Sequence, residues 1–143
     1  MKSLYLYTAS VTSCVLLLSA CGSSGPADSD IIAAIEDKYH IGENRVLSLA
    51  YAFLAMAGVQ YGGGVMLNEC SFDIDSKTVD EIQGDDTFYN VTGNVSCTGY
   101  KYKSGPFGPQ PNGPFEFDSR SFVANIKVNT SGKVMAENLR RPE

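Results

Sequence analysis

The sequence predicts an α+β fold, in which two N-terminal helices pack on an antiparallel β-meander of three to four strands. Apolar residues recur at helical spacing between residues 31 and 60. From residue 66 onward apolar and polar residues alternate, which is typical of strands with one buried face. Because an apolar helix must bury its surface against another element, the two patterns together indicate a two-layer domain.

The expected helices cover residues 31–39 and 43–60. The first helix is preceded by three residues that cap helix N-termini well, namely Asp28, Ser29 and Asp30. The second is apolar on nearly every side, as in a helix buried within a core. The uncharged stretch 46–67 is also long enough to cross a bilayer, so a membrane segment stands as an alternative. The glycine triplet at 62–64 favours the core helix.

Four strands are expected at residues 66–75, 86–103, 115–129 and 133–139. Their inward-facing residues are expected to be Cys70, Phe72 and Ile74 in the first, Val91, Val95 and Cys97 in the second, and Phe122, Ala124, Ile126 and Val128 in the third. Residues 129–132 have the composition of a hairpin turn, with Gly132 where a left-handed backbone is needed. The opposite face, rich in Asn, Thr, Tyr and Lys, can stay in contact with water.

The N-terminal residues have the composition of an export signal. Lys2 supplies a positive charge, and residues 4–18 form an uncharged apolar run that is too short to span a bilayer. Residues 18–21, Leu-Ser-Ala-Cys, end this run and resemble the lipobox of bacterial lipoproteins. In that family the signal is cut before the cysteine, whose sulfur receives a diacylglycerol. The resemblance implies that Cys21 is lipidated, the alternative being an ordinary secretory peptide cut near Ala20.

The lipobox resemblance also implies a location and a domain organisation. A lipidated cysteine places the protein in the cell envelope, and Gly22 in place of Asp favours the outer membrane, facing the periplasm, over the inner membrane. The expected parts are a signal peptide at 1–20, a flexible tether at 21–30, one domain at 31–139 and a tail at 140–143. The order of helices and strands is similar to that of small outer-membrane assembly lipoproteins and of cystatin-like and NTF2-like folds, a likeness of fold alone.

Charge limits the partners of the exported chain. Loss of Lys2 with the signal leaves ten basic and sixteen acidic side chains, a formal charge of −6. An acidic chain without basic clusters argues against binding to nucleic acid and against electrostatic adhesion to anionic lipid. The chain is therefore expected to attach to the membrane through its N-terminal lipid alone.

The four cysteines have separate expected fates. Cys14 lies within the signal and Cys21 is modified, which leaves Cys70 and Cys97 in an oxidising compartment. Both lie on the apolar faces of their strands, so a disulfide between them is expected, with two free buried thiols as the alternative.

The segment 103–116 is the candidate binding region. It holds four prolines and repeats Gly-Pro-Phe, with Phe107 and Phe115 as the two phenylalanines. An extended loop of low entropy with apolar side chains suits recognition of a partner. The alternative is a hairpin connection whose phenylalanines fold back on the sheet. Tyr100 and Tyr102, next to lysines, can form a stacking surface or equally an ordinary exposed sheet face.

The sequence offers little for catalysis, and no cofactor or metal is expected. His40 is the only histidine, and no serine or cysteine stands in a nucleophile motif. The acidic residues between 73 and 86 miss the calcium-loop spacing, because Lys77 stands where a ligand is needed. The prediction is a non-enzymatic, lipid-anchored envelope protein that binds another envelope protein. The alternative is a periplasmic inhibitor of a lysozyme or protease that uses residues 105–115.

Overall fold

A computed structural model describes residues 25–45 and 63–143 of the chain. Within them, helix α1 (Asp28–Tyr39) is followed by four strands, β1 (Gly64–Gln83), β2 (Asp86–Gly105), β3 (Gly108–Val128) and β4 (Val134–Arg140). The strands lie in the order β1-β2-β3-β4, and all neighbours are antiparallel. The described part is therefore mostly β, a four-stranded meander with one short helix. The prediction of an α+β fold with two helices on the sheet is wrong.

The helix expected at 43–60 does not begin where the sequence pattern placed it. Residues 43–45 are not helical, and Asn44 adopts the left-handed φ of 51°. The rest of that expected helix lies outside the described residues. The alternative of a membrane segment at 46–67 ends within β1, which contains residues 64–67. No helix among the described residues is long and apolar enough to cross a membrane.

The four predicted strands and their inward faces are confirmed, but two of the strands, β1 and β3, are much longer than expected. In β2 the odd-numbered residues from Val91 to Gly99 are buried and the even-numbered ones are more exposed. Phe122, Ala124 and Ile126 are buried in β3, and Cys70, Phe72 and Ile74 of β1 pack against the same core. The predicted turn at 129–132 is also confirmed, with φ of 78° at Gly132. The strands lengthen because β1 runs on to Gln83, and β2 and β3 continue through the proline-containing segment.

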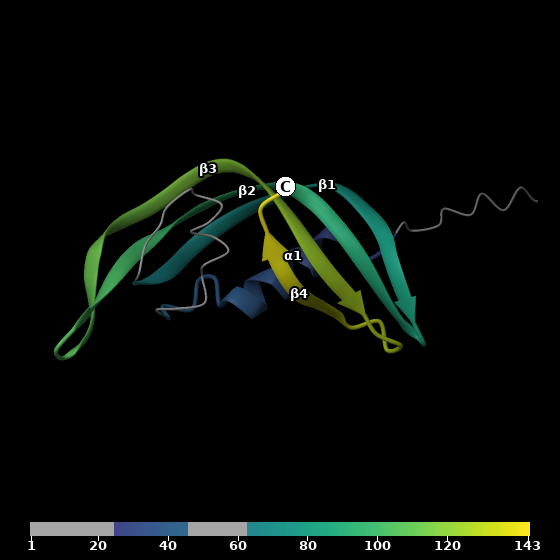
Figure 1. Cartoon of the computed structure of the whole chain (residues 1–143), viewed down its shortest axis with the longest axis horizontal. Coiled ribbons are helices and arrows are strands. Elements are labelled where there is room, and N and C mark those ends of the chain that lie inside the picture. Colours follow the sequence, from purple (N-terminus) through teal and green to yellow (C-terminus); the bar gives the residue numbers. More distant parts are fainter. Residues whose placement is uncertain (1–24, 46–62) are drawn as a thin grey trace, which may run out of the picture.

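The sheet is bent into an arch, with α1 on its concave side (Figure 1). The register of β1 against β2 shifts between Leu67 and Glu69 and again between Ile74 and Ser76. Two buried glycines lie opposite these bulges, Gly99 across from Leu67 and Gly93 across from Ile74. A Cβ on either glycine would collide with backbone carbonyl oxygens of β1. Bulges and glycines together let a sheet curve, so these positions explain the arch.

Helix α1 closes the concave side of the arch. Its residues Ile31, Ile35 and Tyr39 are buried together with the inward residues of the sheet. The helix ends at His40, whose left-handed φ of 50° lets the chain turn back. The amide of Gly42 then donates to the carbonyl of Leu67 at 2.9 Å, which fastens the end of the helix to β1. At its start, α1 includes residues 28–30 of the segment expected to be a tether, and Arg140 of the expected tail is the last residue of β4.

Candidate binding surface

Phe107 stands at the tip of the hairpin that joins β2 to β3. Gly105 pairs with Gly108, so Pro106 and Phe107 alone form the turn. Proline fixes its own φ near the value that the first central position of a common turn requires. Gly108 has φ of 114°, which a residue with a side chain rarely adopts. Phe107 is left 99% exposed, the most exposed large apolar side chain among the described residues.

Three prolines lie within β3, which corrects the prediction of an extended loop at 103–116. Pro109, Pro111 and Pro114 are paired with Ser104, Tyr102 and Tyr100 of β2. Because these β2 partners are two residues apart, all three prolines occupy the same phase of the ladder, the phase in which a backbone nitrogen points away from β2. A bulge between Pro111 and Pro114, where Gly113 has φ of 102°, keeps Pro114 in this phase. No ladder hydrogen bond is lost, and the outer edge of this part of β3 is closed to further strands.

The two predicted tyrosines lie side by side on the outer face next to this hairpin. Tyr100 is 45% exposed and is flanked across the ladder by Met66 and Pro114. Tyr102 is flanked by Gly64 and Pro111, and its hydroxyl lies 3.9 Å from the sulfur of Met66. Rings, prolines and a thioether thus form one continuous apolar strip. We call this strip, together with Phe107, the hairpin surface; its residues are Met66, Tyr100, Tyr102, Phe107, Pro109, Pro111 and Pro114.

A shallow open hollow of about 310 Å³ lies at the end of the hairpin surface. It is lined by residues of all three long strands, namely Gly64, Tyr102, Lys103, Ser104, Gly105, Gly108 and Pro109. Because its walls are largely backbone, glycine and proline, the hollow offers carbonyl and amide groups beside the ring of Tyr102. This arrangement suits an extended peptide or a protruding side chain, which can bond to the backbone groups and pack on the ring of Tyr102.

The outer face changes character toward the middle of the strands. There short polar side chains bond to one another: Ser76 to Thr92 at 2.7 Å, Asn94 to Asp75 at 3.2 Å and Ser96 to Asp118 at 2.7 Å. These groups satisfy each other across the ladder. The apolar hairpin surface therefore gives way to a network of short polar side chains along the middle of the outer face.

Phe115 has a different place from Phe107. It is only 3% exposed and packs edge to face with Phe117, with ring centroids 5.6 Å apart. It lies opposite the buried Gly99, on the inner face of the sheet. The structure thus separates the two residues that the repeated Gly-Pro-Phe placed together: Phe115 belongs to the core and Phe107 to the surface.

The expected disulfide between Cys70 and Cys97 is confirmed. The two residues are direct cross-strand partners of β1 and β2, with Cα atoms 4.2 Å apart. Cys97 is buried in the core, and Cys70 packs against it. Cys21, the expected site of lipidation, lies outside the described residues.

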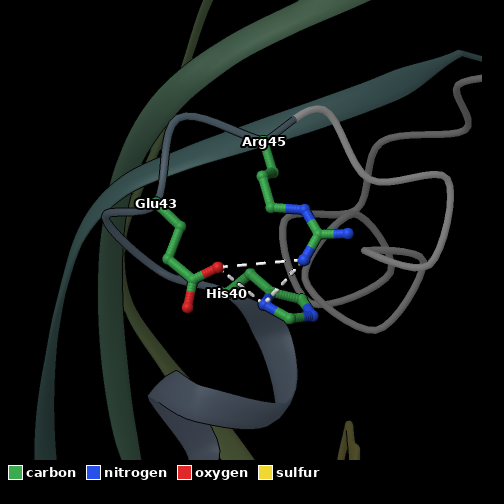
Figure 2. Close-up of polar contacts among 3 residues, drawn as sticks. All are labelled: His40, Glu43 and Arg45. Carbon is green, nitrogen blue, oxygen red and sulfur yellow. Dashed lines mark hydrogen bonds and ion pairs between the residues drawn. The ribbon is translucent and has the colours of Figure 1, made fainter.

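His40, Glu43 and Arg45 form a small polar cluster after α1 (Figure 2). Nδ1 of His40 lies 2.8 Å from a carboxylate oxygen of Glu43 and 3.4 Å from a guanidinium nitrogen of Arg45. A protonated Nδ1 donates to Glu43, and a bare Nδ1 accepts from Arg45, so the two hydrogen bonds exclude each other. The side chains are exposed, and such ion pairs contribute little to stability. Among the described residues the cluster has no serine or cysteine nucleophile as a partner, and we assign it to closing the turn.

Two of the acidic residues between 73 and 86 are engaged by other side chains of the sheet. The carboxylate of Asp75 accepts a hydrogen bond from Asn94, and the carboxylate of Asp86 forms an ion pair with Lys127 at 2.7 Å. Each of these two carboxylates therefore already has a partner side chain on the outer face. The hydrogen bond from Lys127 to Asp86 raises the pKa of the lysine. Within residues 25–45 and 63–143, no three His, Cys, Asp or Glu side chains are close enough together to hold a metal ion.

Tyr39 gives the domain a predicted weakness at high pH. Burial raises the pKa of Tyr39 above its ordinary value of 10.0, and a hydrogen bond with the backbone of Leu139 opposes this only in part. Because the folded state favours the neutral phenol, this stability is fully present below the pKa of the unfolded chain. It is lost as pH rises from about 10 through the folded pKa. We expect urea unfolding to show lower stability at pH 11 than at pH 8, and Tyr39→Phe to show a smaller decrease. An equal decrease in both proteins would contradict this assignment.

No protein-family model, no curated protein and no solved structure matches this chain. Any statement about its function therefore depends on its own sequence and geometry.

Two features of the surface were missed by the sequence reasoning. Strand register alone shows that the prolines share one phase with Tyr100 and Tyr102. Val79 and Ile82, both largely exposed, were expected in no strand, because β1 was expected to end at residue 75. The two apolar residues are three positions apart because the bulge at 79–81 interrupts the period of two, so alternation could not have identified them.

Proposed function

We propose that this chain is a lipid-anchored protein of the bacterial cell envelope that binds another envelope protein through the hairpin surface and has no enzymatic role. The observation that carries the proposal is the full exposure of Phe107 beside an apolar strip of tyrosines and prolines. Contiguous apolar patches on a protein surface often mark interaction sites, and a few aromatic anchors supply most of the energy of a protein interface.

The geometry of the hairpin supports a protein partner in particular. Proline at the turn and in the adjacent strand fixes the backbone, so little conformational entropy is lost when the hairpin docks. Tyrosine rings provide contact area with few rotatable bonds, and the hollow beside Tyr102 offers backbone hydrogen-bonding groups. A rigid apolar projection next to a hollow that offers backbone hydrogen-bonding groups resembles an interface core with its rim.

Phe107→Ala should weaken capture of the partner at least about tenfold, because a buried aromatic anchor contributes about 2 kcal/mol or more to binding. The measurement is quantitative crosslinking in native membranes, followed by detergent extraction and mass spectrometry of what co-purifies. Lys133→Ala is the control: it truncates an exposed side chain next to the β3–β4 turn, away from the hairpin surface. The same loss of capture in both variants would show that the hairpin surface is not the binding site.

The lipid anchor has its own test. Cys21→Ala should abolish incorporation of labelled palmitate and release the protein from the membrane fraction, because two or more acyl chains are needed for stable anchoring. The control is the protein with Cys21 intact, labelled in parallel. Labelling that persists in Cys21→Ala would remove the anchor from the proposal, but would leave the hairpin surface to be tested on the soluble protein.

The hairpin surface also suits a second function, inhibition of a lysozyme or a protease. A two-residue turn that carries a fully exposed ring is narrow enough to enter an enzyme cleft. In this case the purified protein blocks lytic or proteolytic activity, and Phe107→Ala removes the inhibition. An accessory subunit co-purifies with a resident complex and leaves those activities unchanged.

A further inference from the structure

The chain enters the described fold at the β1–β2 end of the sheet. The ammonium group of Lys77 donates to the carbonyl of Pro26 at 3.1 Å and lies 2.7 Å from a carboxylate oxygen of Asp28. Gly25 lies against the ring of Tyr89 so closely that a Cβ there would be 2.7 Å from the ring carbon Cε1. The residues just before α1 are therefore fastened to the inner face of β1 and β2.

An exposed apolar pair lies on this same face and at this same end. Val79 pairs with Tyr89, and Ile82 pairs with Thr87 one step nearer the turn. Cross-strand partners share a face, so Val79 lies directly beside the ring that Gly25 contacts. The two side chains are 56% and 66% exposed, although they continue the inner face that forms the core elsewhere. No described residue covers either side chain.

The length of chain before Gly25 limits how far the described fold can lie from Cys21. Four peptide units separate Cys21 from Gly25, and an extended chain spans at most about 3.6 Å per residue, or about 14 Å in total. A lipid on Cys21 therefore holds the β1–β2 hairpin close to the bilayer surface. Phe107 lies at the other end of β2, about 60 Å away along a strand of this length at about 3.3 Å per residue. Figure 1 shows the two hairpins at opposite ends of the arch.

We propose that Val79 and Ile82 contact the headgroup region of the membrane that holds the Cys21 anchor. The domain then rests on the bilayer by its β1–β2 hairpin and leaves the hairpin surface free for its partner. This inference depends on the proposed lipid anchor. Two apolar side chains bind a membrane weakly by themselves, but the anchor makes the contact intramolecular and so gives it a high effective concentration.

Charge at the same hairpin sets the kind of lipid that is favoured. Asp80, Glu81 and Asp85 are exposed around the apolar pair. Carboxylates are repelled by anionic headgroups over roughly one Debye length, about 8–10 Å at physiological salt. The contact is therefore expected with zwitterionic lipid and should weaken as anionic lipid is added.

The experiment uses the native protein, purified from its membrane and reconstituted into phosphatidylcholine vesicles that contain a headgroup-nitroxide lipid. Mass spectrometry first establishes that Cys21 carries its lipid. A fluorophore is attached through p-azidophenylalanine placed at position 85, in the β1–β2 turn, or at position 107, in the β2–β3 turn. Quenching by the nitroxide then reports which hairpin lies at the membrane. The same measurement at position 85 is repeated in the double variant Val79→Ser and Ile82→Ser.

We expect loss of most emission at position 85 and no loss at position 107. The double variant should recover most of the emission at 85, and vesicles with one third phosphatidylglycerol should recover part of it. Equal quenching at the two positions, stronger quenching at 107, or unchanged quenching in the double variant would overturn the membrane contact while leaving the anchor intact. A native protein whose Cys21 carries no lipid would overturn the anchor and the contact together. Both serine replacements are at exposed positions, and an unchanged thermal melt establishes that the variant is folded.

Discussion

Phe122→Ala is expected to lower the free energy of unfolding by about 3–5 kcal/mol, because it removes a large, fully buried ring and leaves a cavity. Phe122 is 0% exposed and is the largest fully buried side chain among the described residues. Its ring packs edge to face with Phe72, with centroids 5.8 Å apart and planes at 87°. A loss of this size is a large fraction of the stability of a typical domain, so the variant should be largely unfolded at moderate urea concentrations.

The chain offers a matched control for this prediction. Phe107→Ala removes the same side chain from a position where it is 99% exposed, so its stability should stay within about 0.5 kcal/mol of the unchanged protein. Urea unfolding followed by circular dichroism gives both values. If the two variants lose the same stability, then either Phe122 is not in the core or Phe107 is not in water.

Reduction of the Cys70–Cys97 disulfide is expected to lower the free energy of unfolding by about 3–4 kcal/mol, because the bond closes a loop of 27 residues in the unfolded chain. The bond joins direct partners on β1 and β2, so the ladder on either side holds the two thiols together in the folded state. Reduction should therefore leave the circular dichroism spectrum of the folded protein nearly unchanged. Its main effect should be to increase the conformational entropy of the unfolded chain.

The comparison of oxidised with reduced protein keeps every side chain in place and so isolates the cross-link. Cys70→Ala combined with Cys97→Ala should cost slightly more, because Cys97 is buried and its truncation leaves a small cavity. Coincident urea midpoints for the oxidised and reduced proteins would contradict the prediction. Such a result would mean that the unfolded chain keeps the two strands together without the bond.

Most of the sheet could be predicted from the sequence, because alternation and turn chemistry are local properties. The inward sets of β1, β2 and β3 follow from a period of two, and Asn129 and Gly132 identify the last turn from their conformational preferences. The disulfide followed from two cysteines on apolar faces in a chain expected to be exported. The predicted fold class was wrong because the described residues are mostly strand, with α1 as their single helix, and Asn44, near the start of the expected second helix, adopts a left-handed conformation.

The structure of the segment 103–116 could not be predicted from local sequence preferences. The four prolines were interpreted as holding an extended loop of low entropy, and a proline within a strand removes a ladder hydrogen bond when its nitrogen faces the partner strand. In the structure a bulge and a free strand edge let Pro109, Pro111 and Pro114 sit inside β3 without that loss. Whether a proline breaks a strand depends on its phase relative to a partner far away in the sequence. The same register leaves Phe107 exposed at the turn and buries Phe115 in the core.

By itself, then, the sequence determined the alternating strands, the final turn, the cysteine pair and the expectation of an anchor at Cys21. Only the tertiary structure decided the curvature of the sheet, the phase of the prolines, and the placing of Phe107 at one end with Val79 and Ile82 at the other. The physical reason is that side-chain alternation is encoded residue by residue. Register, bulges and exposure arise from pairing between segments up to tens of residues apart, and a single-residue shift there moves a side chain to the other face.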